Sequence, residues 1–439
     1  MKNISLEKLE NKGFFQENSC GGACFKDSLD YIGPSSGGFG LQHILLQLPE
    51  SHLIFISPSG CGRHTSLASL KDDTKKRISY YLLTASEIID GYDDQMEEAV
   101  VEMVDILTKM KRRPKAIITI VSCLDNLIGT DNASVIRRLR ERIPDIDFQE
   151  GHMDPITRDT ETPPLVKGIN TIYNFLKEGS AKEKTKDVNI IGCFLPLPEN
   201  NELYKLVAPG KVRQVSTEGS YDEFQKEANS KVNIVMHPGG IYAAKELKNR
   251  FGTPFIPMFT TYSIKNIDQA YESLARLLEV DFDKEILDSY RQEAEKTIDK
   301  ALEIMGDRPI WVSSGGVKRP FDTAKALIEY GFNVEAVLAS DDLPFEREAK
   351  EWLEINCPNI RYMQADHFSR AKRAYLNDQV LGIGFDAAYQ AGSSYVVSLV
   401  NDLDLFGYYG LKTLMEEIID AIKNPKDLKE MIDKANLVI

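Results

Sequence analysis

The chain has 439 residues, of which 42% are hydrophobic and 27% are charged, and its formal net charge is −14. This composition predicts a soluble protein with several folded domains and excludes disordered, collagen-like and disulfide-stapled chains. So acidic a chain lacks the basic surface of nucleic-acid-binding proteins, and we expect no nucleic-acid partner. No apolar run approaches the ~18 residues that would cross a bilayer, so we expect no membrane partner. The N-terminal sequence MKNISLEKLENKGFF contains no apolar signal segment, which predicts a cytoplasmic location.

Short β-branched runs alternate with helical patterns along the chain. Buried strands are predicted at 52–56, 116–121, 188–192, 232–236, 309–313, 333–338, 380–383 and 395–400. Amphipathic helices are predicted at 95–110, 134–143, 242–250 and 282–304. This alternation predicts an α/β fold of doubly wound, Rossmann-like domains with parallel sheets.

Two weak seams divide the pattern. The polar stretch 178–186 reads as a linker, and the long helix at 282–304 is followed by Gly306 and Pro309, which form a stop signal. These seams predict three α/β domains, at 1–183, 184–305 and 306–439, and the first of them is expected to bind a cluster.

Several common phosphate and metal motifs are missing from the sequence. It contains no G-x-x-x-x-G-K-[ST] loop, no G-x-G-x-x-G fingerprint, no H-E-x-x-H and no C-x-x-C. The run Ser313-Ser314-Gly315-Gly316 follows a predicted strand and is interpreted as an ordinary turn. The chain is therefore not expected to bind ATP itself, and no catalytic residue can be named from it.

Two of the six cysteines directly follow predicted strands. Cys61 lies in the turn after 52–56, and Cys123 comes two residues after 116–121. Ligands gather at the carboxyl ends of strands in open α/β sheets, so both thiols are expected at the functional edge of the first domain. Cys20 and Cys24 lie in a Gly-rich segment, and thiols that converge from loops suit an iron–sulfur cluster. The alternative is that these cysteines are ordinary small buried residues; Cys193 and Cys357 are interpreted as structural.

Three stretches together resemble the component-1 family of nitrogenases. They are HLIFISPSGCG, TIVSCLDNLIGTDNASVIRRL and FGYYGLKTLMEEIIDAI. The family comprises catalytic dinitrogenase subunits, cofactor-assembly scaffold subunits and nitrogenase-like reductases. The resemblance implies three α/β domains, pairing with a homologous or identical subunit, and a nitrogenase-type ATP-dependent reductase as electron donor.

The resemblance also implies a bridging iron–sulfur cluster, 4Fe–4S or larger, held by Cys61 and Cys123. Serine stands where the family has a first cluster cysteine, in the segment Gly33-Pro34-Ser35-Ser36-Gly37-Gly38. Three alternatives follow: Cys24 or Cys20 takes over this role, a serine oxygen ligates, or this chain supplies fewer thiolates. Of these we favour Cys24.

The region that matches the family's active-site cofactor also departs from its pattern. The family places a cysteine near the end of a middle-domain strand, where this chain has His237, a residue that can bind iron. No histidine appears in 403–410, where the family has a second cofactor ligand. Gly239 and Gly240 are an alternative site for an anion, with Lys318 and Arg319 contributing from the third domain.

The function expected from these observations is a subunit of a nitrogenase-like oxidoreductase. It would bind an iron–sulfur cluster at a subunit interface and receive electrons from the reductase. A scaffold that holds a metallocluster precursor and a cluster-free α/β binding protein are the alternatives.

Overall fold

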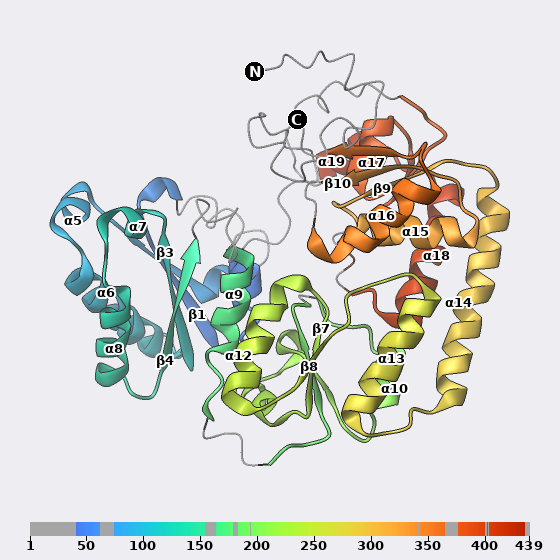
Figure 1. Cartoon of the computed structure of the whole chain (residues 1–439). Coiled ribbons are helices and arrows are strands. Elements are labelled where there is room, and N and C mark those ends of the chain that lie inside the picture. Colours follow the sequence, from blue (N-terminus) through green and yellow to red (C-terminus); the bar gives the residue numbers. More distant parts are fainter. Residues whose placement is uncertain are drawn as a thin grey trace.

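The computed structural model describes residues 41–61, 74–153, 164–178, 183–193, 195–339, 343–364, 376–399, 402 and 404–434. Within these ranges the chain forms three sheets in which every strand pairing is parallel (Figure 1). The doubly wound α/β prediction is therefore confirmed. Among the helices of these ranges, none combines the length and the hydrophobicity of a membrane-spanning helix.

The first sheet has the strand order β2-β1-β3-β4. Its strands are β1 (Ser51–Ser57), β2 (Ile78–Leu82), β3 (Ala116–Ser122) and β4 (Asp147–Met153). The accompanying helices are α3 (Leu41–Leu45), η2 (Thr74–Arg77), α5 (Ala85–Asp90), α6 (Asp93–Lys109), α7 (Leu124–Ile128), α8 (Asn132–Arg142) and α9 (Pro164–Tyr173). Side chains alternate across each strand, so Ile54 and Ile117 pack with α6 and α8, whereas Phe55 and Ile118 pack with α9.

The middle sheet has the order β6-β5-β7-β8. Its strands are β5 (Val188–Ile191), β6 (Val212–Arg213), β7 (Val232–Val235) and β8 (Phe255–Pro257). Its helices are α10 (Glu202–Val207), η5 (Val215–Thr217), α11 (Tyr221–Gln225), η6 (Lys226–Asn229), η7 (Pro238–Gly240), α12 (Ile241–Phe251) and α13 (Ile264–Leu278), and α14 (Lys284–Met305) leads onward.

The third sheet has the order β11-β10-β9-β12-β13. Its strands are β9 (Ile310–Ser313), β10 (Val334–Ala339), β11 (Arg361–Gln364), β12 (Leu381–Ile383) and β13 (Tyr395–Val397). Its helices are α15 (Pro320–Tyr330), η8 (Pro344–Glu346), α16 (Arg347–Asn356), α17 (Phe385–Ala391), α18 (Gly407–Lys423) and α19 (Leu428–Lys434).

Each sheet changes its winding direction at one place. Strands are added toward one edge of the sheet first and then toward the opposite edge. The direction changes between β1 and β3, between β5 and β7, and between β9 and β12. A crevice forms at the carboxyl ends of two such strands, because the connections after them run in opposite directions. Each of the three sheets therefore has one such switch point.

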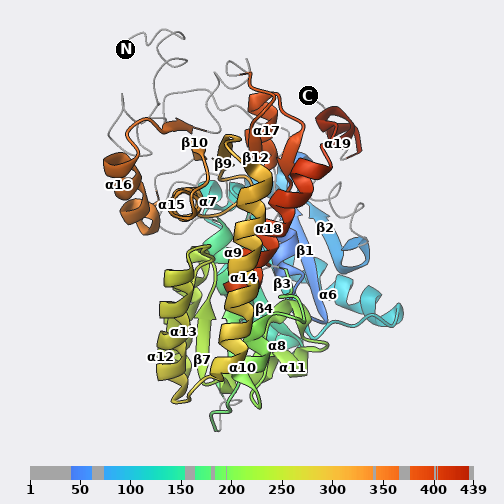
Figure 2. The same ribbon diagram turned by 90° about the vertical axis from the view of Figure 1, so that its right-hand side faces the viewer.

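The units are not packed as separate globules. One apolar core joins the middle and third sheets and includes Ile234 and Val312, and a second joins the first and middle sheets and includes Phe55 and Val235. The long helix α14 packs along α18, as the two views show (Figures 1 and 2). The predicted boundaries at 183 and 305 stay predictions.

The start of α18 is fixed by a buried carboxylate from the middle unit. Oε1 of Glu202 accepts hydrogen bonds from the backbone N–H of Tyr408 (2.6 Å) and from the Tyr271 hydroxyl (2.7 Å), and Oε2 accepts one from the N–H of Tyr409 (3.2 Å). Gly407 has a φ of 65°, and a Cβ there would collide with the Glu202 carboxylate. The glycine of this Gly-Tyr-Tyr-Gly sequence thus allows the helix to approach its cap.

Candidate functional site

The switch point of the first sheet lies next to the two cysteines that the sequence singled out. Cys61 closes a short turn after β1, in which its N–H donates to the carbonyl of Pro58 at 3.1 Å, and Cys123 stands at the start of α7 directly after β3. Strands β1 and β3 pair in register, with Ile56 opposite Val121. Both thiols therefore lie at the same edge of the sheet, at its switch point, and both are half-buried.

The donor set at this edge fits part of an iron–sulfur site. Two cysteine thiols on adjacent strand ends are soft ligands of the kind that such clusters need. Within the described ranges, no group of three or more His, Cys, Asp or Glu side chains is placed to hold a metal ion. Cys20 and Cys24 lie outside the described residues, as does the serine-containing segment 33–38.

Behind Cys123 stands a buried polar group that sequence reasoning missed. Nδ2 of Asn132 donates a hydrogen bond to Oδ2 of Asp125 at 3.1 Å, and burial raises the pKa of Asp125 to about 6. Burial also raises the pKa of Glu150 in β4, whose carboxylate lies 3.2 Å from Nε2 of His152. The hydrogen bond from Asn132 ties α7, which begins directly after Cys123, to the start of α8. In the sequence, the only indication of this group was the position of Asp125 just after a predicted buried strand.

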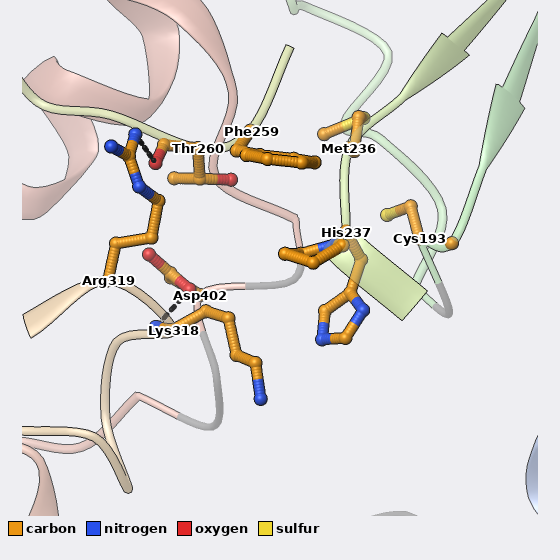
Figure 3. A pocket seen from close by; sticks show the side chains of 10 residues that line it. Cys193, Met236, His237, Phe259, Thr260, Lys318, Arg319 and Asp402 are labelled. Carbon is orange, nitrogen blue, oxygen red and sulfur yellow. Dashed lines mark hydrogen bonds between the residues drawn. The ribbon is translucent and has the colours of Figure 1, made fainter. Parts of the chain in front are cut away.

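A second candidate site is a cavity where the crevices of the middle and third sheets face each other (Figure 3). Cys193 and His237 come from the ends of β5 and β7, whereas Lys318 and Arg319 follow β9. Among the described residues, the lining consists of Gly192, Cys193, Met236, His237, Pro238, Phe259, Thr260, Lys318, Arg319 and Asp402. Lys318 and Arg319, expected from the sequence to reach the Gly239 and Gly240 turn, line this cavity together with His237.

His237 is held as a neutral imidazole. Its Nδ1 accepts a hydrogen bond from the N–H of Gly239 at 2.9 Å, so the proton of the neutral ring is on Nε2. Burial, together with the charge of Lys318, lowers the pKa of His237 to about 3. Binding of iron through Nε2 would move the proton to Nδ1 and break the bond from Gly239.

The glycine turn beside His237 has its own amides satisfied. The N–H of Gly239 donates to the His237 ring, and the N–H of Gly240 donates to the His237 carbonyl at 2.8 Å. An anion would have to displace these bonds to use either donor. The positive charge of the cavity therefore comes from Lys318 and Arg319.

Cys193 and Asp402, two further polar residues of the lining, form hydrogen bonds with other groups of the protein. The Cys193 thiol donates to the Leu195 carbonyl at 2.9 Å, and burial raises its pKa to about 12, which agrees with a structural role. The buried carboxylate of Asp402 accepts from the N–H of Lys318 (2.9 Å) and from the hydroxyl of Tyr262 (3.0 Å). Asp402, which lies just before the segment 403–410 that was compared with the family's histidine, was not named from the sequence.

The turn that carries Lys318 is an ordinary, internally bonded one, as predicted. The N–H of Gly315 donates to Oγ of Ser313 at 3.1 Å, and the N–H of Gly316 donates to the Ser313 carbonyl at 3.0 Å. A Cβ at Gly316 would lie 2.5 Å from the Cα of Gly384, so glycine allows the ends of β9 and β12 to approach each other.

Comparison with known proteins agrees with the arrangement of three sheets. The family model described as nitrogenase component 1 type oxidoreductase matches residues 38–423. A solved structure of nitrogenase Cp1 at pH 6.5 has a TM-score of 0.70 and 15% identity, covering 94% of this chain and 97% of that one. A structure of nitrogenase Cp1 at pH 5 has a TM-score of 0.58 and 13% identity, with 89% of each chain covered. At these identities the likeness shows the fold. A sequence search of curated proteins finds no match.

Proposed function

The chain belongs to the nitrogenase component 1 type oxidoreductase family, and we propose that it is a subunit that holds an iron–sulfur cluster at a subunit interface and accepts electrons from a separate ATP-dependent reductase. The observation that carries this proposal is the placement of Cys61 and Cys123 at the switch point of the first sheet. A bound iron–sulfur cluster would supply one-electron transfer there.

Cys61 and Cys123 would hold the cluster from this chain. Because no third ligand stands beside them within the described ranges, the set would be completed by the N-terminal cysteines, of which Cys24 is favoured over Cys20, or by another subunit. Both thiols are half-buried, and a low-potential cluster needs shielding from water, so a covering partner is part of the proposal.

Apolar side chains around this edge support a partner surface. Leu127, in α7 directly after Cys123, is 74% exposed; Leu82, at the end of β2, is 50% exposed; and Ile89 in α5 is 81% exposed. Figure 1 shows α5 and α7 at the same end of the first sheet. Exposed apolar groups gathered at one edge are typical of protein interfaces, and a homologous or identical subunit is the proposed partner.

The requirement for a separate reductase is supported by the missing phosphate motif. The sequence has no Gly-x4-Gly-Lys-Ser/Thr loop, so ATP hydrolysis would take place on a separate P-loop protein. This chain, with its shared apolar cores, would hold the electron acceptor in a fixed place.

Anaerobic purification with the native partner subunit provides the test. We expect bound iron and sulfide, and an electron paramagnetic resonance signal that changes when a nitrogenase-type reductase and ATP are added together. The chain without the reductase should not hydrolyse ATP. Hydrolysis by the chain alone, or stimulated hydrolysis with no change in the cluster signal, would contradict the proposal; the second result would favour a scaffold that holds a cluster precursor.

A further inference from the structure

We propose that the carboxyl group of Glu227 is uncharged in the folded protein, and that its ionisation at alkaline pH releases the segment 221–229 from the start of the middle unit. This segment comprises α11 and η6, and Glu227 lies in η6. The proposal goes beyond the proposed function and does not depend on it, because the segment contributes to neither candidate site.

The side chain of Glu227 is buried without a hydrogen-bond donor. Glu227 is 1% exposed, and neither its Oε1 nor its Oε2 has a hydrogen-bond partner. An ionised carboxylate in such a place costs far more free energy than a neutral acid, since no donor replaces the water that the charge loses. The geometry therefore favours the protonated form.

The amide groups next to Glu227 are bonded elsewhere. Nδ2 of Asn189 donates to the backbone carbonyl of Glu227 at 2.9 Å and to Oδ1 of Asn233 at 2.8 Å. Oδ1 of Asn189 accepts a hydrogen bond from the hydroxyl of Ser230 at 2.6 Å. The carbonyl of Glu227 fixes the orientation of the Asn189 amide, because only its NH2 group can donate. These neighbours hold the backbone of η6 and leave the carboxyl group without a donor.

Two charged groups act on the carboxyl group of Glu227 from nearby, and they oppose each other. Burial raises the pKa of Glu227 well above its ordinary value, Glu218 after η5 raises it further, and Arg213 of β6 lowers it. Nε of Arg213 pairs with Oδ2 of Asp187 at 2.7 Å, and its Nη1 pairs with Oε1 of Glu218 at 3.2 Å. The positive charge of Arg213 is thus balanced by these two carboxylates.

The other elements around η6 bring no counter-charge to Glu227. Their titratable side chains are bonded to other groups, and they are Tyr173, Lys184, Glu223, Lys226 and Arg250. Glu223 and Lys226 pair with each other. The side chains from α9, from the stretch before β5 and from α12 donate to backbone carbonyls. Within the described ranges, Glu227 therefore forms no ion pair.

The segment around Glu227 joins two parts of the chain. On one side, Nε2 of Gln225 donates to the carbonyl of Phe175, just after α9, at 2.8 Å. On the other side, the carbonyl of Asn229 accepts a hydrogen bond from the N–H of Thr185, ahead of β5, at 2.8 Å. A charged Glu227 would have to turn toward water, and we expect this movement of η6 to break the bond to Thr185.

Urea unfolding tests the charge state of Glu227. The unfolded chain releases this proton near the ordinary pKa of 4.5, whereas the folded chain retains it, so a rising pH favours unfolding until the raised pKa is reached. Between about pH 5 and pH 7, the unfolding equilibrium constant of wild type should rise about tenfold per pH unit relative to that of Glu227→Gln. His237, whose lowered pKa acts in the opposite direction, remains in both proteins.

Glu272→Gln, at an exposed position of α13, is the matched control and should keep the wild-type pH dependence. Glu227→Met has a similar length and no charge, and it should behave as Glu227→Gln does. The same pH dependence in wild type and in both Glu227 variants would overturn the proposal.

Infrared difference spectroscopy at pH 7 detects the same group directly. The carbonyl stretching band of a protonated carboxylic acid should be present in wild type and missing from Glu227→Gln. A carboxylate band in its place would overturn the proposal.

Hydrogen exchange tests the release of the segment. When the pH of wild type is raised until the acid band disappears, protection of the Thr185 N–H should fall about tenfold or more, whereas Glu227→Gln should keep it. The N–H of Ile310, which donates to the carbonyl of Asn333 at 2.8 Å, should stay protected in both proteins. Unchanged protection of Thr185, or an equal loss at Thr185 and Ile310, would contradict the proposed release.

Discussion

The backbone N–H of Gly239 donates a hydrogen bond of 2.9 Å to Nδ1 of His237, and this contact decides the chemistry of the imidazole. It places the proton of the neutral ring on Nε2, facing away from the turn. The same contact makes protonation of the ring costly, because a second proton would have to go onto the nitrogen that accepts the bond. His237 is therefore a fixed neutral donor in this fold.

The stability of the protein should fall in mild acid because of His237. Its pKa of about 3 lies below the ordinary value of 6.5, so the unfolded chain takes up the proton first as the pH falls. The contribution of the neutral His237 ring to the free energy of unfolding is fully present above pH 6.5 and is lost progressively as the pH falls toward 3. Between pH 7 and pH 5 this one group should lower the free energy of unfolding by about 2 kcal/mol.

His237→Asn tests this expectation, because an asparagine oxygen can accept the same bond without titrating. Urea unfolding at pH 7 and pH 5 should show a smaller loss of stability in this variant than in wild type. His52, whose pKa is lowered to about 4 by burial and by Arg77, contributes in the same direction and remains in both proteins. An unchanged pH dependence in His237→Asn would show that the ring is not held neutral.

The cap on α18 should be sensitive to a single methyl group. At Gly407 a Cβ would meet the Glu202 carboxylate and the Tyr271 hydroxyl, and the φ of 65° is strained for any other residue. Gly407→Ala should lower the free energy of unfolding by at least about 2 kcal/mol, as measured in urea. Gly219→Ala, where the added atom meets nothing within 4 Å, is the matched control. Equal stability of the two variants would contradict the described cap.

The apolar edge of the first sheet should mediate oligomer formation. Wild-type protein is expected to sediment as at least a dimer, and Leu127→Asp should shift it toward the monomer, because a charge would be buried in the interface. Ile355→Asp, at a residue that is 78% exposed in α16, should leave the sedimentation coefficient unchanged. A wild-type monomer that retains its iron would contradict the proposed interface.

The sequence predicted the central strands and the edge strand β13, and it missed the other edge strands. Strands β1 and β3 are buried at every position, so their apolar runs mark them clearly. Strand β4, with the sequence DFQEGHM, lies at an edge and exposes most of its side chains in part, so its polar sequence resembles a loop. Strand β2, with the sequence ISYYL, lies at the other edge and was also missed, although its residues favour strands; it is only five residues long.

Of the two candidate sites, the sequence could predict the first and only part of the second. Cys61 and Cys123 could be placed together, because both follow strands that any parallel sheet would bring to one edge. The approach of Lys318 to the turn after His237 was expected from the family resemblance, whereas the place of Asp402 beside them depends on how two sheets pack against each other and could not be derived. The engaged amides at Gly239 and Gly240 likewise follow from the local turn geometry, which the sequence does not specify.

The iron content of cysteine variants, purified without oxygen together with the partner subunit, tests the cluster proposal most directly. Cys61→Ala and Cys123→Ala should each lose most of the iron and sulfide that wild type carries. Cys357→Ala should retain both, because that cysteine lies at the end of α16, on the third unit. Wild-type iron content in both Cys61→Ala and Cys123→Ala would contradict the account.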